Sequence, residues 1–277
     1  MTALEEVMRG WLLRVARSPE RERLVLRGSL LMQSWGSPRA PADVDHLLLG
    51  AYDERAARAM VDALLVREDD DVVFDRATVT HDAIWAETPF PGLRSAVEGR
   101  SPRFDGEARL QVDVGHGDPL AAPPAPQVIL GVPALLGVRP ETMLAWKAHG
   151  LFEFGHGSWR AKDLYDLWFL DRHVPLDDDL ASASIRLAFD SRNTELRVAD
   201  RFLFTELWGA SRGSRRRWES LGRRARLDLP DVLEAVACVR RRLRPLFASL
   251  GRTASDAGDG APGDHEEAPE ERDRDDG

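Results

Sequence analysis

The stretch "RGSLLMQSWGSPRAPADVDHLLL", residues 27–49, decides the fold that we expect, because it places two aspartates on one face of a strand. Side chains alternate along a β-strand, so in "DVDHLLL" Asp43 and Asp45 point the same way while Val44 packs on the other side. Two carboxylates this close raise each other's pKa, which costs free energy unless a cation lies between them. The stretch therefore predicts a cation site.

A second predicted strand, "ARLQVDVG" (108–115), offers a third carboxylate. Leu110, Val112 and Val114 share its apolar face, and Asp113 points to the other face. Three carboxylates from neighbouring strands can hold two divalent cations about 3.5–4 Å apart, and Mg²⁺ prefers such oxygen ligands. The alternative is three unrelated acids at strand ends, each paired with a nearby arginine.

A glycine turn precedes the aspartates. Gly28 ends a strand predicted over "RLVLRG", and Ser29 opens a helix predicted over "SLLMQSW". Glycine lets the backbone approach a ligand closely, and the start of a helix offers unpaired N–H groups to an anion. A triphosphate bound here would lie beside metal ions on the next strand. Arg39, four residues before Asp43, would contact phosphate or only solvate a loop, and the turn itself could be an ordinary one.

Charge is unevenly distributed along the chain of 277 residues, which carries a formal net charge of −9. Residues 255–277 hold ten acids against two arginines and no large apolar side chain, so we expect a disordered acidic tail. The single cysteine excludes an internal disulfide, and no apolar run is long enough to span a bilayer. These features predict a cytoplasmic protein with no membrane contact.

The order of the predicted elements indicates an α+β fold in three parts. Strands and helices mix through residue 125, and the proline-rich stretch "DPLAAPPAPQVILGVP" (118–133) is interpreted as a connector between lobes. Helical periodicity dominates after it. We therefore predict an α/β lobe over 1–125, a helical lobe over 126–250 that completes a cleft, and a disordered acidic tail over 251–277.

The chain has only two lysines, and both fall in the predicted helical lobe. Lys147 lies beside the apolar stripe of the helix in "RPETMLAWKAHGLFEF", where it either reaches out to solvent or points into a cleft. Asp163 is similarly placed at the start of the next helix. Lys162 and Asp166 are spaced as an outward i,i+4 ion pair with a structural role.

A basic stretch follows in "SRGSRRRWESLGRRAR" (211–226). Arg215, Arg216 and Arg217 could neutralise an RNA backbone while Trp218 stacks on a base. The alternative is a solvated helix face balanced by nearby acids.

Three segments, in this order, resemble the AbiEii/AbiGii-type nucleotidyltransferase toxins, which include the MenT toxins. They are "LVLRGSLLMQSWGSPRAPADVDHLLL" (24–49), "LQVDVGHGDPL" (110–120) and "RPETMLAWKAHGLFEFGHGSWRAKDLYDLWFL" (139–170). The resemblance implies a DNA-polymerase-β-like nucleotidyltransferase fold, with a mixed sheet and flanking helices.

The same resemblance implies roles for single residues. Asp43, Asp45 and Asp113 would hold two Mg²⁺ ions, with Mn²⁺ as a substitute. The turn at 28–29 would hold the triphosphate of an NTP. Lys147 would grip its phosphates, and Asp163 would be a further acid of the active site.

The function implied is transfer of NMP from an NTP to an acceptor hydroxyl, with RNA, and the tRNA 3′ end in particular, as the expected acceptor. The chain would be the toxin of a toxin–antitoxin or phage-defence system, with a cognate antitoxin protein as partner. Two alternatives remain: a transferase of the AMPylating type that modifies proteins, or a non-catalytic nucleic-acid-binding module with a degenerate site.

Overall fold

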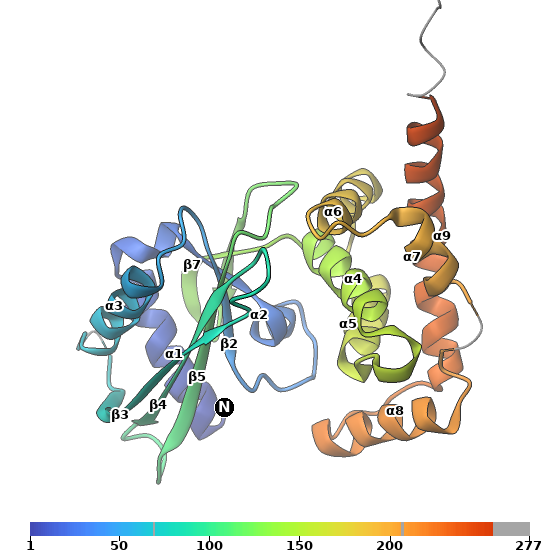
Figure 1. Ribbon diagram of the computed structural model, residues 1–277. Helices are drawn as coiled ribbons and strands as arrows, with labels where there is room; N and C mark the ends of the chain where they lie inside the picture. The colour runs from blue at the N-terminus through green and yellow to red at the C-terminus, as the bar shows by residue number, and fades with distance from the viewer. Residues whose placement is uncertain (69, 206–207, 257–277) are drawn as a thin grey trace, which may run out of the picture.

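The computed structural model describes residues 1–68, 70–205 and 208–256, and it places a sheet lobe beside a helical lobe (Figure 1). The sheet lobe runs through Gly137, and the helical lobe begins at Pro140. The α+β class and the helical second half agree with the sequence-based predictions.

The sheet has seven strands in the order β3-β4-β5-β2-β1-β7-β6. Their bounds are β1 Leu24–Arg27, β2 Val44–Leu48, β3 Val73–Ile84, β4 Gly92–Arg100, β5 Ala108–His116, β6 Ala125–Ile129 and β7 Val132–Gly137. The pairs β2–β5 and β1–β7 are parallel, and the other neighbours are antiparallel. The sheet is therefore mixed, and β2 and β5 lie side by side at its centre.

Two long helices cover one face of this sheet. Helix α1 (Ala3–Ala16) begins with a capping box of Thr2 and Glu5, and α3 spans Glu54–Leu65. Helix α1 contacts the sheet at β2, where His46 accepts a hydrogen bond from the indole of Trp11 of α1 at 3.1 Å. Since side chains alternate along β2, Asp45 points to the opposite face, away from α1.

The helical lobe contains the helices that follow the sheet. Their bounds are α4 Pro140–Ser158, α5 Ala161–His173, α6 Asp178–Asp190, α7 Leu196–Leu203, α8 Arg212–Ala225 and α9 Val232–Asp256. Buried aromatic and aliphatic side chains of these helices include Phe189 and Phe247, whose rings meet edge to face at 5.5 Å, and they join those of the sheet lobe in one hydrophobic core. The helices pack chiefly on one another, as do the elements of the sheet lobe.

Three predicted features of the fold differ from the structure. The stretch interpreted as a connector, 118–133, contains β6 and the start of β7, so the sheet continues past the predicted boundary at residue 125. No strand was predicted over 92–100, where β4 lies between β3 and β5. Residues 251–256 continue α9, and the rest of the predicted tail lies outside the described residues.

A separate short helix, α2 (Gly28–Ser34), leaves β1 directly, and the 3-10 turn η1 (Pro19–Glu22) precedes β1. Among the residues that the structure describes, no helix has the length and apolar character needed to cross a bilayer.

Candidate active site

Three carboxylates meet on the face of the sheet away from α1. Asp45 of β2 pairs in register with Asp113 of β5, and Asp43 directly precedes β2. One oxygen of each lies within 4.8 Å of the others. This spacing confirms that the three side chains converge, as the strand periodicity predicts.

Gly28 lets the chain pass tightly beside this triad. Its φ of +73° lies in the left-handed region, and a Cβ added there would be 1.9 Å from Oδ2 of Asp45. Ser29, the next residue, directs its Oγ to within 3.5 Å of Oδ1 of Asp43. The predicted glycine turn and the carboxylates therefore form one site, with the backbone of α2's first residue against the acids.

The electrostatics of the triad are unfavourable for three bare carboxylates. Burial raises the pKa of Asp45 to about 6, the charges of Asp43 and Asp113 add to the rise, and Arg27 opposes it. Arg27 lies opposite Asp45 on β1. A divalent cation would relieve this repulsion, and the all-oxygen donor set is the kind that Mg²⁺ prefers.

Arg94 of β4 holds Asp113 from its outer side. Nε donates to Oδ1 at 2.9 Å and Nη2 donates to Oδ2 at 2.7 Å, a bidentate pair. Because β4 and β2 flank β5 on opposite sides, Arg94 approaches from the strand away from Asp45 and does not separate the carboxylates. Its own side chain is 42% exposed, so the arginine lies at the edge of the site.

A second charged cluster, which we call the ionic hub, consists of Arg39, Lys147, Arg160, Asp163 and Asp166. The Nζ of Lys147 lies 2.9 Å from Asp163 and 2.8 Å from Asp166, and both aspartates are fully buried. Arg160 adds a contact of 2.6 Å to Asp163. Burial alone would lower the pKa of Lys147, but the two carboxylates outweigh it and the net shift is upward.

The hub corrects one prediction and modifies another. Asp166 does not form an outward pair with Lys162, because its side chain is buried and contacts Lys147. Arg39, predicted at a phosphate, donates from Nε and Nη2 to the two oxygens of Asp166 at 3.0 and 2.9 Å. Since Arg39 belongs to the sheet lobe and Asp166 to α5, this bidentate pair ties the lobes together.

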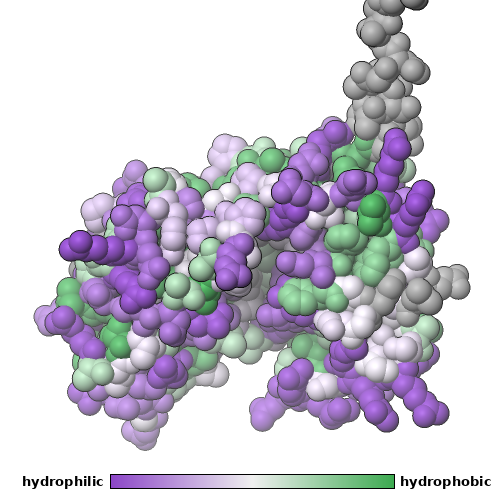
Figure 2. Space-filling model, in the orientation of Figure 1, coloured by the Kyte–Doolittle hydropathy of each residue, from purple (hydrophilic) through white to green (hydrophobic). Residues whose placement is uncertain are grey.

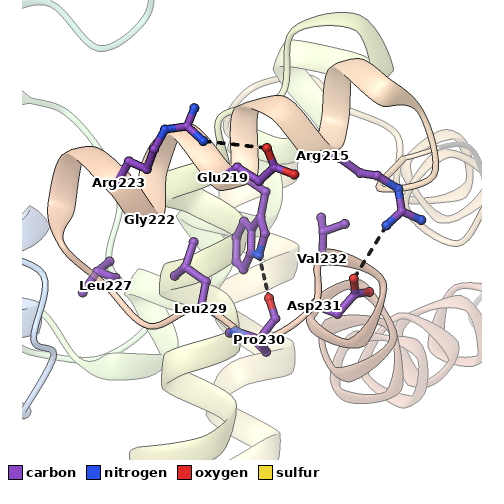
Figure 3. Close-up of a pocket in the computed structure, with 10 residues that line it drawn as sticks. Arg215, Glu219, Gly222, Arg223, Leu227, Leu229, Pro230, Asp231 and Val232 are labelled. Carbon is purple, nitrogen blue, oxygen red and sulfur yellow. Dashed lines mark hydrogen bonds and ion pairs between the residues drawn. The ribbon is translucent and has the colours of Figure 1, made fainter.

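The basic stretch on α8 is partly as predicted. Arg215 and Arg216 are exposed, and Arg215 lies 3.7 Å from Asp231 (Figure 3). Arg217 is half-buried and donates to the carbonyl of Gly157.

Trp218 corrects the predicted base contact. It is only 4% exposed, and its indole N–H donates to the carbonyl of Pro230 at 2.8 Å. Trp218 is one of the residues that line a cavity of about 510 Å³ between α8 and the start of α9, the pocket drawn in Figure 3. The prediction that Trp218 stacks on a base is wrong, because its ring is part of the packing of the helical lobe.

Arg94 and Asp166 are among the residues of the site that were not predicted from the sequence. Arg94 belongs to a strand that was not predicted, so nothing placed it near Asp113. Asp166 was assigned to the surface because its spacing from Lys162 suits a helical ion pair. The apolar neighbours of Asp166, Tyr165 and Leu167, were the available sign that its turn of helix is buried.

The mixed sheet, the carboxylate triad and the glycine turn together define a protein of the nucleotidyltransferase class. The model of the family described as nucleotidyl transferase AbiEii toxin, of type IV toxin–antitoxin systems, matches residues 11–246. The chain therefore belongs to this family, which confirms the resemblance drawn from the three sequence segments.

Two solved structures from Helicobacter pylori share the fold. JHP933 has a TM-score of 0.50 and 17% identity, with 92% of this chain and 94% of that chain covered. A putative nucleotidyltransferase has the same TM-score and identity, with 90% of this chain and 95% of that chain covered. At this identity they support the fold alone. A comparison with curated proteins found no match.

Proposed function

We propose that this protein transfers NMP from an NTP to an acceptor hydroxyl of RNA, with release of pyrophosphate, and that the tRNA 3′ end is the acceptor. The observation that carries the proposal is the convergence of Asp43, Asp45 and Asp113 beside the Gly28 turn. Family membership supports a nucleotidyltransferase toxin with a cognate antitoxin as partner, and growth arrest is the outcome that we expect.

The triad suits divalent cations in charge and in donor type. Asp43, Asp45 and Asp113 would hold two Mg²⁺ ions, with Mn²⁺ as a substitute. Bound there, the cations would activate the attacking hydroxyl and offset charge on the transferring phosphoryl group. Arg94 would keep Asp113 oriented through its two contacts. Preorganised carboxylates of this kind lower the cost of reaching the reactive geometry.

The triphosphate would lie between the glycine turn and the ionic hub. Three basic side chains and two acidic ones give the hub a net charge of +1, which favours an anion at its edge. Lys147 is the member that we assign to phosphate, with Arg39 as a positioning residue that holds the hub in place. Asp163 orients Lys147, and Ser29 offers its N–H and hydroxyl from the other side.

The RNA would approach from the helical lobe. The hollow between the lobes and the hydrophilic surface along α8 are both visible in Figure 2. Exposed Arg215 and Arg216 on α8 would contact the RNA backbone, which carries a negative charge at each nucleotide. The proposal needs no base contact from α8, since Trp218 is buried.

The test is incubation of the full chain with each labelled NTP, Mg²⁺ and total RNA. We expect label on a discrete RNA species with the wild-type protein and at least a 100-fold lower rate with Asp43→Ala. Asp105→Ala, which removes an exposed carboxylate in the β4–β5 turn, is the matched control and should label at the wild-type rate. Label on protein instead of RNA would overturn the acceptor, and equal labelling by Asp43→Ala would overturn the active site.

A further inference from the structure

A cluster of Arg27, Trp85 and Trp146 lies on the same face of the sheet as the carboxylate triad. Two glycines at neighbouring strand ends make room for it: Gly92 begins β4, Gly115 lies one residue before the end of β5, and the two are paired in register. Glycine in a strand often marks a close approach by another group. Side chains of the cluster are among the groups that approach these two glycines.

The register places the cluster directly beside the triad. Arg27 starts opposite Asp45, and its guanidinium extends over β5, where a Cβ on Gly115 would be 2.3 Å from Nη2. The indole of Trp85 lies over Gly92, where a Cβ would be 3.2 Å from Cε3. Gly115 follows Asp113 by two residues on the same face, a step of about 7 Å along a strand. One nucleotide can span such a step.

Trp85 presents an aromatic surface to solvent. It is 44% exposed and adopts a φ of +56°, which is rare for a bulky residue. The turn that follows holds it there, since the carbonyl of Trp85 accepts hydrogen bonds from the N–H and the hydroxyl of Thr88 at 2.9 and 2.8 Å. An exposed tryptophan on a constrained backbone, beside an active site, is a feature that a ligand would use.

Arg27 connects this surface to the helical lobe. Its guanidinium lies 5.7 Å from the ring of Trp85 and 5.6 Å from that of Trp146, the half-buried residue that precedes Lys147 on α4. The carboxylate of Asp118 forms two ion pairs, one with Nη1 of Arg27 at 2.8 Å and one with Arg192. The guanidinium of Arg27 and the flat π faces of the two tryptophans suit an aromatic group such as a nucleobase.

We propose that Arg27, Trp85 and Trp146 form a nucleobase-binding subsite, with Trp85 as the stacking surface. The subsite deepens the proposed function and rests on it, since the phosphates of the same nucleotide would lie at the triad. Bases stack on aromatic rings and on guanidinium planes whatever their sequence. The base could belong to the incoming NTP or to the terminal nucleotide of the acceptor RNA.

Equilibrium binding to the full chain, in the presence of Mg²⁺, tests the subsite. The probes are the four NTPs, inorganic tripolyphosphate and a short RNA that ends in CCA. Trp85→Ala is compared with Trp85→Phe, which keeps a stacking ring, and with Val73→Ala, an exposed residue at the other end of β3. Thermal unfolding of each variant reports whether the fold is retained.

We expect Trp85→Ala to raise the Kd of the NTPs at least tenfold, with Trp85→Phe closer to wild type and tripolyphosphate within twofold for every variant. If the NTPs are unchanged and the RNA is weakened tenfold, the subsite holds the acceptor base. Unchanged binding of both, or an equal loss for tripolyphosphate, overturns the subsite.

The two proposals fail in different ways. If the subsite is wrong, RNA labelling still depends on Asp43 while Trp85→Ala binds nucleotide and RNA like the wild type. If the proposed function is wrong, the wild type transfers no label, whereas a dependence of binding on Trp85 would remain measurable.

Discussion

Gly28 meets two demands at once, a left-handed backbone and contact with a carboxylate. Its φ is +73°, and the space that a Cβ would need is taken by Asp45. Gly36, eight residues later, also has a positive φ, of +96°, but nothing lies within 4 Å of its Cβ position. An alanine at Gly36 would meet backbone strain only, whereas an alanine at Gly28 would meet backbone strain and a steric clash with Asp45.

Gly28→Ala should therefore damage the site far more than Gly36→Ala. We expect Gly36→Ala to lose about 1 kcal/mol of unfolding free energy and to keep its activity, because it only places alanine in the left-handed region. Gly28→Ala must also move Asp45, and a displacement of that kind can lower the rate about 100-fold. Denaturant unfolding and RNA labelling measure the two effects. Equal activity of the two variants would mean that the contact with Asp45 is unimportant.

Lys147 occupies a position that arginine should not fill. Its compact ammonium contacts two buried carboxylates at 2.9 and 2.8 Å, whereas the planar fork of arginine is larger and directs its donors differently. We expect Lys147→Arg to lose about 2 kcal/mol of unfolding free energy. Lys162→Arg, at the other lysine, is exposed and should stay within about 0.5 kcal/mol of wild type. Denaturant unfolding measures both variants. Equal losses of unfolding free energy in Lys147→Arg and Lys162→Arg would contradict the prediction.

Helices α4 and α6 meet at a buried histidine whose protonation should affect stability. His149 of α4 lies 3.0 Å from the hydroxyl of Thr194 and packs edge to face on Phe189 of α6 at 4.9 Å. Burial lowers the pKa of His149 to about 4, and Arg192 adds to the shift. The folded protein therefore keeps the ring neutral at a pH where the unfolded chain takes up a proton.

The sign of the pH effect follows from this difference. The unfolded chain protonates His149 below about pH 6.5, so its contribution is fully present above that pH and is lost as the pH falls toward 4. Between pH 7.5 and pH 5, the free energy of unfolding of His149→Gln should fall by roughly 1 kcal/mol less than that of the wild type, after allowance for solvent screening. Denaturant unfolding at both pH values gives the comparison. A wild-type pH dependence in the variant would contradict the prediction.

The elements that carry chemistry were the easiest to predict from the sequence. Strand periodicity gave the shared face of Asp43 and Asp45 and turned Asp113 away from the apolar face of its own strand. The family resemblance then joined Asp113 to the other two. Strand β4, "GLRSAVEGR", has a glycine near each end and no clean alternation, and it was missed. Prolines around β6 suggested a connector, although an edge strand tolerates proline.

Long-range ion pairs were beyond what the sequence could indicate. Arg94 and Asp113 are 19 residues apart and Arg39 and Asp166 are 127 apart, so no local pattern joins them. Trp218 was assigned to the surface because arginines precede it, but helical periodicity places its side chain on the buried stripe with Leu221. Local sequence patterns predict the buried face of a strand or helix. They do not predict which side chains from distant parts of the chain contact that face.

On the scale of the whole molecule, most of the net charge lies in residues 257–277, which hold nine acids and two arginines, a net of −7 out of −9. Deletion of 257–277 should tighten RNA binding about three- to tenfold at 50 mM salt, because it removes negative charge that repels the RNA. The difference should shrink at 200 mM salt, where screening is stronger.

A variant of full length with these nine acids changed to Asn and Gln is the matched control for the deletion. If charge is the cause, it should bind RNA as the deletion does, and Kd values at both salt concentrations decide. If the neutralised variant bound RNA with the Kd of the wild type, the tighter binding of the deletion would be due to chain length and not to charge.

The two lobes are joined by salt bridges, of Arg39 with Asp166 and of Asp118 with Arg192. Both carboxylates are buried, and each also contacts a second base, Lys147 for Asp166 and Arg27 for Asp118. Replacement of Arg39 or Arg192 by a neutral residue would therefore remove a link between the lobes without leaving a buried acid unpaired.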